Sequence, residues 1–265
     1  MERAPYTGPL KLGSTGEAVV LMKRALRKAE LLPGKGKPSG FLGPFAVRAL
    51  VKLGQARVLP AQRPGGAKRR GLKVFKTGGI YGPNAHRKLA PHYDDYGASR
   101  LRAIARARQV ASVQAAGVAA MNLVINNRGV VHYTQGSSRM SGVRGRMVPP
   151  SFGRWEDCSS EATWICYVMH RAAQRFGGSF PDPNNLGYNG QGYTGTQVNH
   201  GVPVSAFGGP IARTFVFYGW PIGHVAVKKS MTRVMSMGSE RGPLDESVGY
   251  RTPTAARAYP MVLPR

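Results

Sequence analysis

Acidic residues and cysteines are scarce in this chain. Of its 265 residues only 12 are Asp or Glu, against 38 Lys and Arg, which gives a formal charge of +26 at neutral pH. The two cysteines, Cys158 and Cys166, stand eight residues apart on a predicted helix, too far to bridge each other. The sequence therefore contains no disulfide framework.

Long apolar runs are also missing. No stretch reaches the roughly 18 apolar residues of a membrane-spanning helix, and the first 20 residues lack the apolar core of a signal peptide. We expect a soluble chain, made in a cytoplasm, that needs release if it acts outside. There is no HExxH motif and no cluster of Cys and His at metal-ligand spacing, so we expect neither a zinc hydrolase nor any other metal or cofactor.

The positive charge is spread over both halves of the chain. Residues 1–92 hold 19 basic and 3 acidic residues, and residues 93–265 hold 19 and 9. Such a charge favours a polyanionic partner through long-range attraction. Nucleic acid and the anionic bacterial wall both qualify, and an arginine-rich composition alone is a third explanation.

The first part of the chain has the pattern of a small three-helix domain. Apolar residues at helical spacing predict a helix over 17–31, capped by Ser14 or Thr15. The segments 40–50 and 79–89 then share a Gly-apolar-x-Gly-Pro-x-Ala-x-Arg-x-Leu pattern, typical of a turn that leads into a helix. We place this domain at residues 1–95.

The second domain, residues 96–265, is predicted to be α+β. Two helical patterns are followed by a long loop over 177–210 and three short strand patterns. We expect the helix that carries Cys158 to pack on an antiparallel sheet. The predicted helices cover 100–127 and 158–176, and the predicted strands cover 214–219, 223–229 and 232–238.

Cys158 is the candidate nucleophile. It stands at a helix start, where free backbone N–H groups and the helix dipole favour a thiolate and can hold an oxyanion. It also lies on the apolar stripe of the same helix, so a packing role is the alternative. Cys166, in the middle of that helix, is predicted to belong to the core.

His224 is the candidate base. It opens the strand pattern HVAV, where it shares one face with Ala226, and that small residue leaves room for a helix end to approach. A hairpin with residue 230 at its turn centre would place Ser236 opposite His224. Ser236 would then orient the imidazole and complete a triad.

Two motifs resemble the NlpC-type cysteine peptidases, which have a papain-like fold and cut peptidoglycan peptides. These are DCSSEATW at 157–164 and GHVAVKKSMTRVMS at 223–236. The resemblance covers about residues 100–265 and assigns Cys158, His224 and Ser236 to the catalytic places. The family usually has His, Asn or Gln at the third place, so Glu240 or a backbone carbonyl is the alternative to Ser236.

The same resemblance assigns further site residues. The segment VVHYTQG looks like the Tyr-containing strand that precedes the family's cysteine, which places Tyr133 near the oxyanion. The loop DPNNLGYNGQGYTGTQVNHG looks like those of endolysins from phages of actinobacteria. We expect the substrate cleft to be shaped by Asp157, Ser159, Tyr188 and Tyr193.

The first domain resembles the three-helix peptidoglycan-binding domain of wall hydrolases. The matching positions are Leu10, Gly13, Ser14, Gly16, Val19 and Gly43-Pro44. The family's Leu-Gln step is Met22-Lys23 here, and its Phe-Gln step is altered. A generic helical bundle with basic faces is the alternative.

Together the two resemblances imply a monomeric phage endolysin for host lysis, made in the host bacterial cytoplasm, whose partners are peptidoglycan and anionic wall polymers. They imply cleavage of the D-glutamyl-diaminopimelate bond by a thiolate mechanism. Alternatives are an N-acetylmuramoyl-L-alanine amidase, a basic nucleic-acid-binding protein and a virion structural protein. No nucleic-acid motif is present, and aromatic residues are not interleaved with the basic ones.

Overall fold

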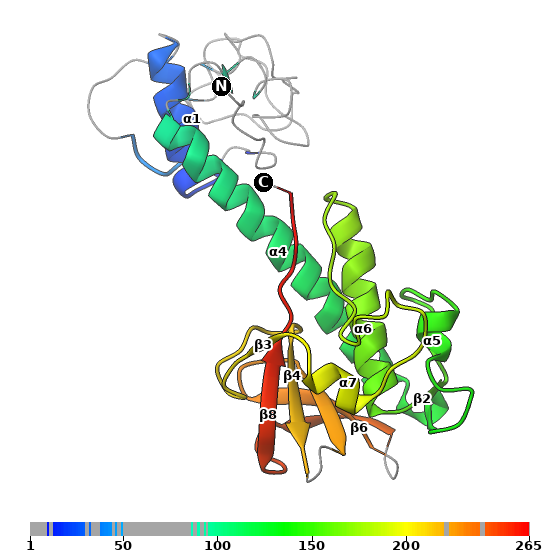
Figure 1. Cartoon of the computed structure of the whole chain (residues 1–265). Helices are drawn as coiled ribbons and strands as arrows, with labels where there is room; N and C mark the ends of the chain where they lie inside the picture. The colour runs from blue at the N-terminus through cyan, green and yellow to red at the C-terminus, as the bar shows by residue number, and fades with distance from the viewer. Residues whose placement is uncertain are drawn as a thin grey trace. The chain divides into compact units, whose positions relative to one another are not determined.

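The structure is a computed structural model of the whole chain (Figure 1). It describes residues 95–219, 223–238 and 242–264, and before them residues 10, 13–29, 32, 38–43, 46, 49, 86, 89, 90 and 93. The chain divides into two compact units, residues 1–108 and 109–265, and the division falls within one helix. The units are treated separately below.

The first unit contains helix α1 (Glu17–Lys28), which buries one apolar face and ends three residues before the predicted end. Its N-cap is Gly16, with φ 102°, and not the predicted Ser14 or Thr15. Thr15 instead forms a β-bridge with Phe41. The predicted second and third helices lie almost entirely outside the described residues.

Helix α4 (Asp95–Asn126) is longer than predicted and supplies apolar residues to the cores of both units. In the second unit it is followed by a 3-10 turn (Arg128–Val130), β1 (His132–Tyr133), α5 (Ser141–Arg144) and β2 (Trp155–Glu156). Strands β1 and β2 pair in parallel, with Tyr133 opposite Glu156. This pair places Tyr133 beside the chain that leads to Cys158.

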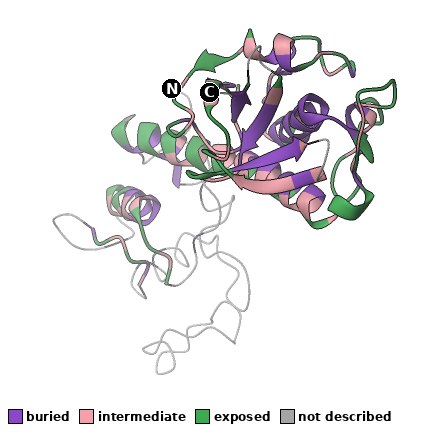
Figure 2. Cartoon of the chain, turned by 90° about the horizontal axis from the view of Figure 1, so that it is seen from below, coloured by how far each residue is buried: buried purple, intermediate pink, exposed green. Residues whose placement is uncertain are grey.

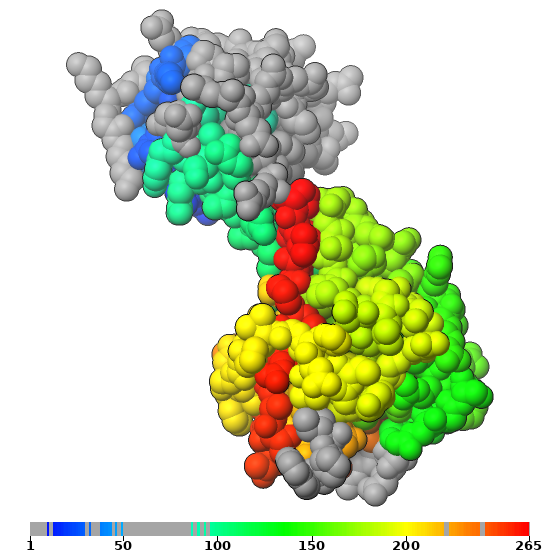
Figure 3. Space-filling view, in the orientation of Figure 1, coloured from blue at the N-terminus to red at the C-terminus, as the bar shows by residue number. Residues whose placement is uncertain are grey.

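The second unit is built on a six-stranded antiparallel sheet of order β3-β8-β4-β5-β6-β7. Its strands are β3 (Val202–Pro203), β4 (Thr214–Tyr218), β5 (His224–Lys228), β6 (Arg233–Gly238), β7 (Gly242–Ser247) and β8 (Pro253–Ala258). The three predicted strands correspond to β4, β5 and β6. The space-filling view shows the chain around α7 (Thr194–Val198), in yellow, beside the red strand β8 (Figure 3).

Helix α6 (Cys158–Gln174) packs against one face of this sheet and is almost entirely buried (Figures 1 and 2). Alternation along the strands sends Val225 and Val227 towards α6, whereas Ala226 joins a smaller cluster on the other face with Val216 and Tyr218. The predicted α+β class, with a Cys-bearing helix on an antiparallel sheet, is confirmed. Within the residues that the structure describes, no helix has the length and apolarity needed to cross a membrane.

Candidate active site

Helix α6 begins at Cys158 because Asp157 caps it. The Ser160 N–H donates to Asp157 Oδ1 over 2.7 Å, and the Asp157 N–H donates to Ser160 Oγ over 2.7 Å, which makes a reciprocal capping box. Ser159 Oγ also donates to Asp157 Oδ1, over 2.8 Å. The other carboxylate oxygen accepts from Arg139 Nη1 at 2.6 Å. Asp157 and Ser159, predicted to shape the cleft, are therefore buried members of the cap.

Replacing Asp157 with Ala is expected to destabilise the second unit by about 2–4 kcal/mol, because it removes the cap and leaves Arg139 without its carboxylate. Urea denaturation followed by tryptophan fluorescence measures this, since all three tryptophans belong to this unit. The matched control is Asp245→Ala, which breaks partly exposed ion pairs with Lys229 and Arg233 and should cost less than about 1 kcal/mol. Equal losses in the two variants would contradict the capping role.

The thiol of Cys158, at the start of α6, meets α7 and β5. Its Sγ lies 3.8 Å from Thr194 Oγ1, at the first position of α7, and only 7% of the residue is exposed. Burial raises the pKa of Cys158, while hydrogen bonds from the backbone of Val225 and from Thr194 oppose that shift. Burial, the largest contribution, therefore acts against the thiolate that the helix start is predicted to favour.

His224 lies in a polar and aromatic cluster. Its Nε2 is 2.9 Å from Ser236 Oγ, and Ser236 Oγ is 2.9 Å from Tyr250 Oη. The ring of Tyr218 packs against both His224 and Tyr250. Burial and the positive charge of Arg251 lower the pKa of His224 to about 4, with the Asp157 carboxylate opposing them. The imidazole is thus neutral at neutral pH, able to accept a proton.

The strand register differs from the predicted one. Ser236 pairs with Ala226 and not with His224, because the turn between β5 and β6 is centred on Met231 instead of residue 230. His224 still reaches Ser236 diagonally, since both side chains lie on the same face of the sheet. The predicted bond from Ser236 to the imidazole is present, from a neighbouring position in the ladder.

The thiol and the imidazole lie on opposite faces of the sheet. Cys158 packs with Val225 on the face that α6 covers, whereas the ring of His224 lies with Tyr218 on the other face. The prediction that α6 approaches the face of Ala226 is therefore wrong. Among the described contacts there is no hydrogen bond between Cys158 and His224. The thiol instead meets the backbone at Val225, the residue that follows His224 in the sequence.

The two groups nevertheless share one end of the sheet. The charge of Asp157 acts on His224 and raises its pKa. Burial raises the pKa of Tyr250, the hydrogen bond of Ser236 lowers it, and the charge of Cys158 adds a smaller upward shift. Cys158 is thus within electrostatic range of the cluster that holds His224. Contacts between catalytic groups are often longer before substrate binds.

Tyr133, which the family resemblance implies as an oxyanion donor, lies within electrostatic range of the thiol. Its hydroxyl accepts a 2.9 Å hydrogen bond from Gln135 Nε2 and keeps its own proton to donate. Burial raises the pKa of Tyr133, and the charges of Cys158 and Asp157 contribute further upward shifts. This position suits a neutral hydrogen-bond donor beside the sulfur.

The two predicted cleft tyrosines occupy different places. Tyr193 is 59% exposed and directly precedes Thr194, the residue that touches the thiol. Tyr188 is instead packed against Tyr167 and His170 on α6, and its hydroxyl donates to the carbonyls of Phe180 and Pro181. The structure therefore places Tyr188 away from the thiol, and Tyr193 is next in the chain to a residue that touches it.

Three residues of the site were not predicted. Thr194 touches the sulfur, Tyr250 supports Ser236, and Arg139 ties Asp157 to the carbonyl of Gly192. No local pattern in the sequence marks them, because each reaches the site through tertiary contacts. The alternative orienter Glu240 lies outside the described residues.

The described side chains offer no grouping of three or more His, Cys, Asp or Glu that is arranged to hold a metal ion. Around this end of the sheet lie hydroxyls, one imidazole and one ion pair. Such a set suits proton transfer and oxyanion stabilisation.

Comparisons with known proteins add little. No family model matches the sequence, and no curated protein is similar to it. Among solved structures the chain is similar to a protein from Staphylococcus aureus described as similar to lipoprotein, of the NLP/P60 family. The identity is 14%, the TM-score is 0.34, and the match covers 80% of this chain and 61% of that one, less than two thirds of its length. We draw no functional conclusion from a similarity at this level.

Proposed function

We propose that this protein is a cysteine hydrolase that cleaves an amide bond of bacterial peptidoglycan, with Cys158 as nucleophile and His224 as base. The observation that supports it is the place of the Cys158 sulfur. It lies at the capped start of α6, against the backbone of the residue that follows His224. A free thiol, a base and backbone donors are the parts that thiol acyl transfer needs.

Because burial keeps both the thiol and the imidazole neutral at neutral pH, proton transfer accompanies attack. In this proposal His224 takes the proton of the thiol at Nδ1 when the substrate complex brings the two groups together, whereas Nε2 is bonded to Ser236 in the resting structure. The sulfur bonds to the carbonyl carbon, and the Cys158 N–H with the hydroxyl of Tyr133 stabilises the oxyanion. His224 then protonates the leaving amine, and water hydrolyses the thioester.

The wider role is that of a phage endolysin for host lysis, with the first unit binding the wall. The motifs at 157–164 and 223–236 and the pattern around Gly43-Pro44 support this role. The charge of +26 suits an anionic wall with its polymers, and wall binding should weaken as salt rises. The proposed bond is the one between D-glutamate and diaminopimelate.

Digestion of purified walls tests the proposal. We expect the turbidity to fall and new amino groups to appear on diaminopimelate, as measured by mass spectrometry of the released fragments. New amino groups on L-alanine would show the amidase activity instead. Intact walls together with salt-dependent binding to DNA would overturn the hydrolase and favour a nucleic-acid-binding protein.

A further inference from the structure

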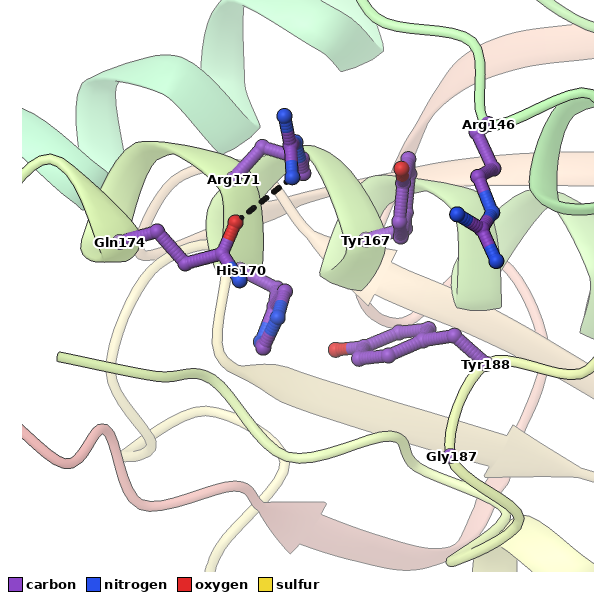
Figure 4. Close-up of a pocket in the computed structure, with 7 residues that line it drawn as sticks. All are labelled: Arg146, Tyr167, His170, Arg171, Gln174, Gly187 and Tyr188. Carbon is purple, nitrogen blue, oxygen red and sulfur yellow. Dashed lines mark hydrogen bonds between the residues drawn. The ribbon is translucent and has the colours of Figure 1, made fainter.

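A hollow lies along α6, away from the thiol (Figure 4). Its volume is about 340 Å³, near the lower end of the range for small-molecule sites. Its nearest helical residue, Tyr167, is nine positions beyond Cys158, which is about 13 Å along the helix. The hollow is lined by Arg146, Tyr167, His170, Arg171, Gln174, Gly187 and Tyr188.

The lining is cationic. Arg146 follows α5 and Arg171 stands on α6, and both side chains are exposed beside the hollow (Figure 4). Arg171 Nη1 donates to Gln174 Oε1 over 2.8 Å, which fixes one guanidinium. His170 Nδ1 lies 3.0 Å from the Phe180 carbonyl oxygen and 3.4 Å from the Phe180 backbone nitrogen, so Phe180 occupies this nitrogen and Nε2 is left for a ligand.

No acidic residue neutralises these cations among the described residues that line the hollow. The nearby Asp182 is buried, and its carboxylate accepts the backbone N–H groups of Asn184, Leu186 and Tyr188. Asp182 therefore holds the loop in place. The two guanidinium groups keep their positive potential for a ligand.

The chain is held in a costly conformation on both sides of the hollow. Arg146 and Tyr188 have φ angles of 51° and 57°, in the left-handed region that non-glycine residues seldom adopt. Such a conformation is costly and persists where surrounding contacts impose it. For Tyr188 those contacts are hydrogen bonds: its hydroxyl donates to two backbone carbonyls, and its backbone N–H donates to the carboxylate of Asp182. The floor of the hollow is therefore fixed before any ligand arrives.

We propose that this hollow binds a phosphate ester of a small polyhydroxy compound. Two guanidinium groups line the hollow, and Arg forms paired hydrogen bonds with phosphate oxygens, to which Nε2 of His170 adds a donor when the ring is protonated. The Gln174 amide nitrogen remains for a hydroxyl of the ester. This binding site is independent of the thiol chemistry proposed above.

A nucleic-acid strand fits the hollow less well. Base recognition without sequence preference uses exposed aromatic faces on which bases stack. Here Tyr188 packs edge-on against Tyr167, with ring centroids 5.5 Å apart, and tilts against His170 at 5.2 Å. Tyr167 itself is 7% exposed. The rings thus form a floor, and the volume suits one phosphorylated unit.

The test is a titration of the full chain with glycerol 3-phosphate at constant ionic strength. The ring proton signals of His170 are followed by nuclear magnetic resonance and assigned with His170→Gln. The chain carries many other cations that could bind the ester, so a local signal is needed. The ring protons of His170 report binding in the hollow. We expect saturable shifts in the wild type and binding weakened at least about tenfold in Arg146→Gln and in Arg171→Gln. Arg128→Gln, an exposed arginine of the same unit outside the hollow, should bind within twofold of the wild type.

Several results would overturn the proposal. One is an unshifted His170 signal. Another is wild-type affinity for the ester in both arginine variants, each with native fluorescence. A third is inorganic phosphate that binds as tightly as the ester. Displacement of the ester by a single-stranded oligonucleotide of higher affinity would assign the hollow to nucleic acid instead.

Discussion

Cys158→Ala is expected to reduce the rate of wall hydrolysis at least about 1,000-fold, because the thiol forms the covalent bond in the proposed mechanism. The change removes one sulfur atom from a small buried side chain and leaves the cap by Asp157 in place, so the second unit should stay folded. Turbidity loss of purified walls measures the rate, and circular dichroism checks the fold. Wall binding should be retained, since the first unit is unchanged.

The matched control is Cys166→Ala, on the same helix. Cys166 is completely buried, and burial raises its pKa well above the ordinary value, so it stays a neutral part of the core. We expect this variant to hydrolyse walls at a rate within a few-fold of the wild type. If Cys158→Ala hydrolyses as fast as Cys166→Ala, Cys158 is a packing residue and the hydrolase proposal fails.

Local sequence signals predicted the site best where the chemistry is local. The start of α6 follows from Asp157 and Ser160 at capping distance, followed by an apolar stripe. Strands β4 to β6 follow from short runs rich in apolar and β-branched residues. By contrast, β7 and β8 have the sequences GPLDES and PTAARA, which lack such runs. These two strands form because they pair with β6 and β4.

Tertiary contacts decided what the sequence did not predict. Helix α7 lies within a loop rich in Gly and Asn, and only the folded chain brings Thr194 to the sulfur of Cys158. The pKa of Cys158 has the same origin. A helix start favours the thiolate, but the depth at which α6 is buried is a property of the whole second unit, and burial raises the pKa.

His224→Ala is the second change with a large expected effect, about 100- to 10,000-fold on the rate, the usual range for loss of a positioned acid–base group. The pH profile of the wild type provides an independent check. Because the pKa of His224 is lowered to about 4, the base is present at neutral pH and is lost only as pH falls through about 4. Initial rates measured between pH 3.5 and 8 should therefore stay level well below the pKa of an ordinary histidine.

Ser236→Ala distinguishes a positioned imidazole from a merely buried one. Ser236 is bonded to both His224 and Tyr250, so its loss frees Nε2 without removing the base. We expect an intermediate loss of about 10- to 100-fold, with the KM for wall fragments little changed. If His224→Ala retains the wild-type rate, another residue is the base. His224, on the other face of the sheet, then has only a structural role. If Ser236→Ala keeps the wild-type rate while His224→Ala loses it, His224 acts without the hydrogen bond from Ser236. The hydrogen-bond partner of Nε2 then changes when the imidazole approaches the thiol.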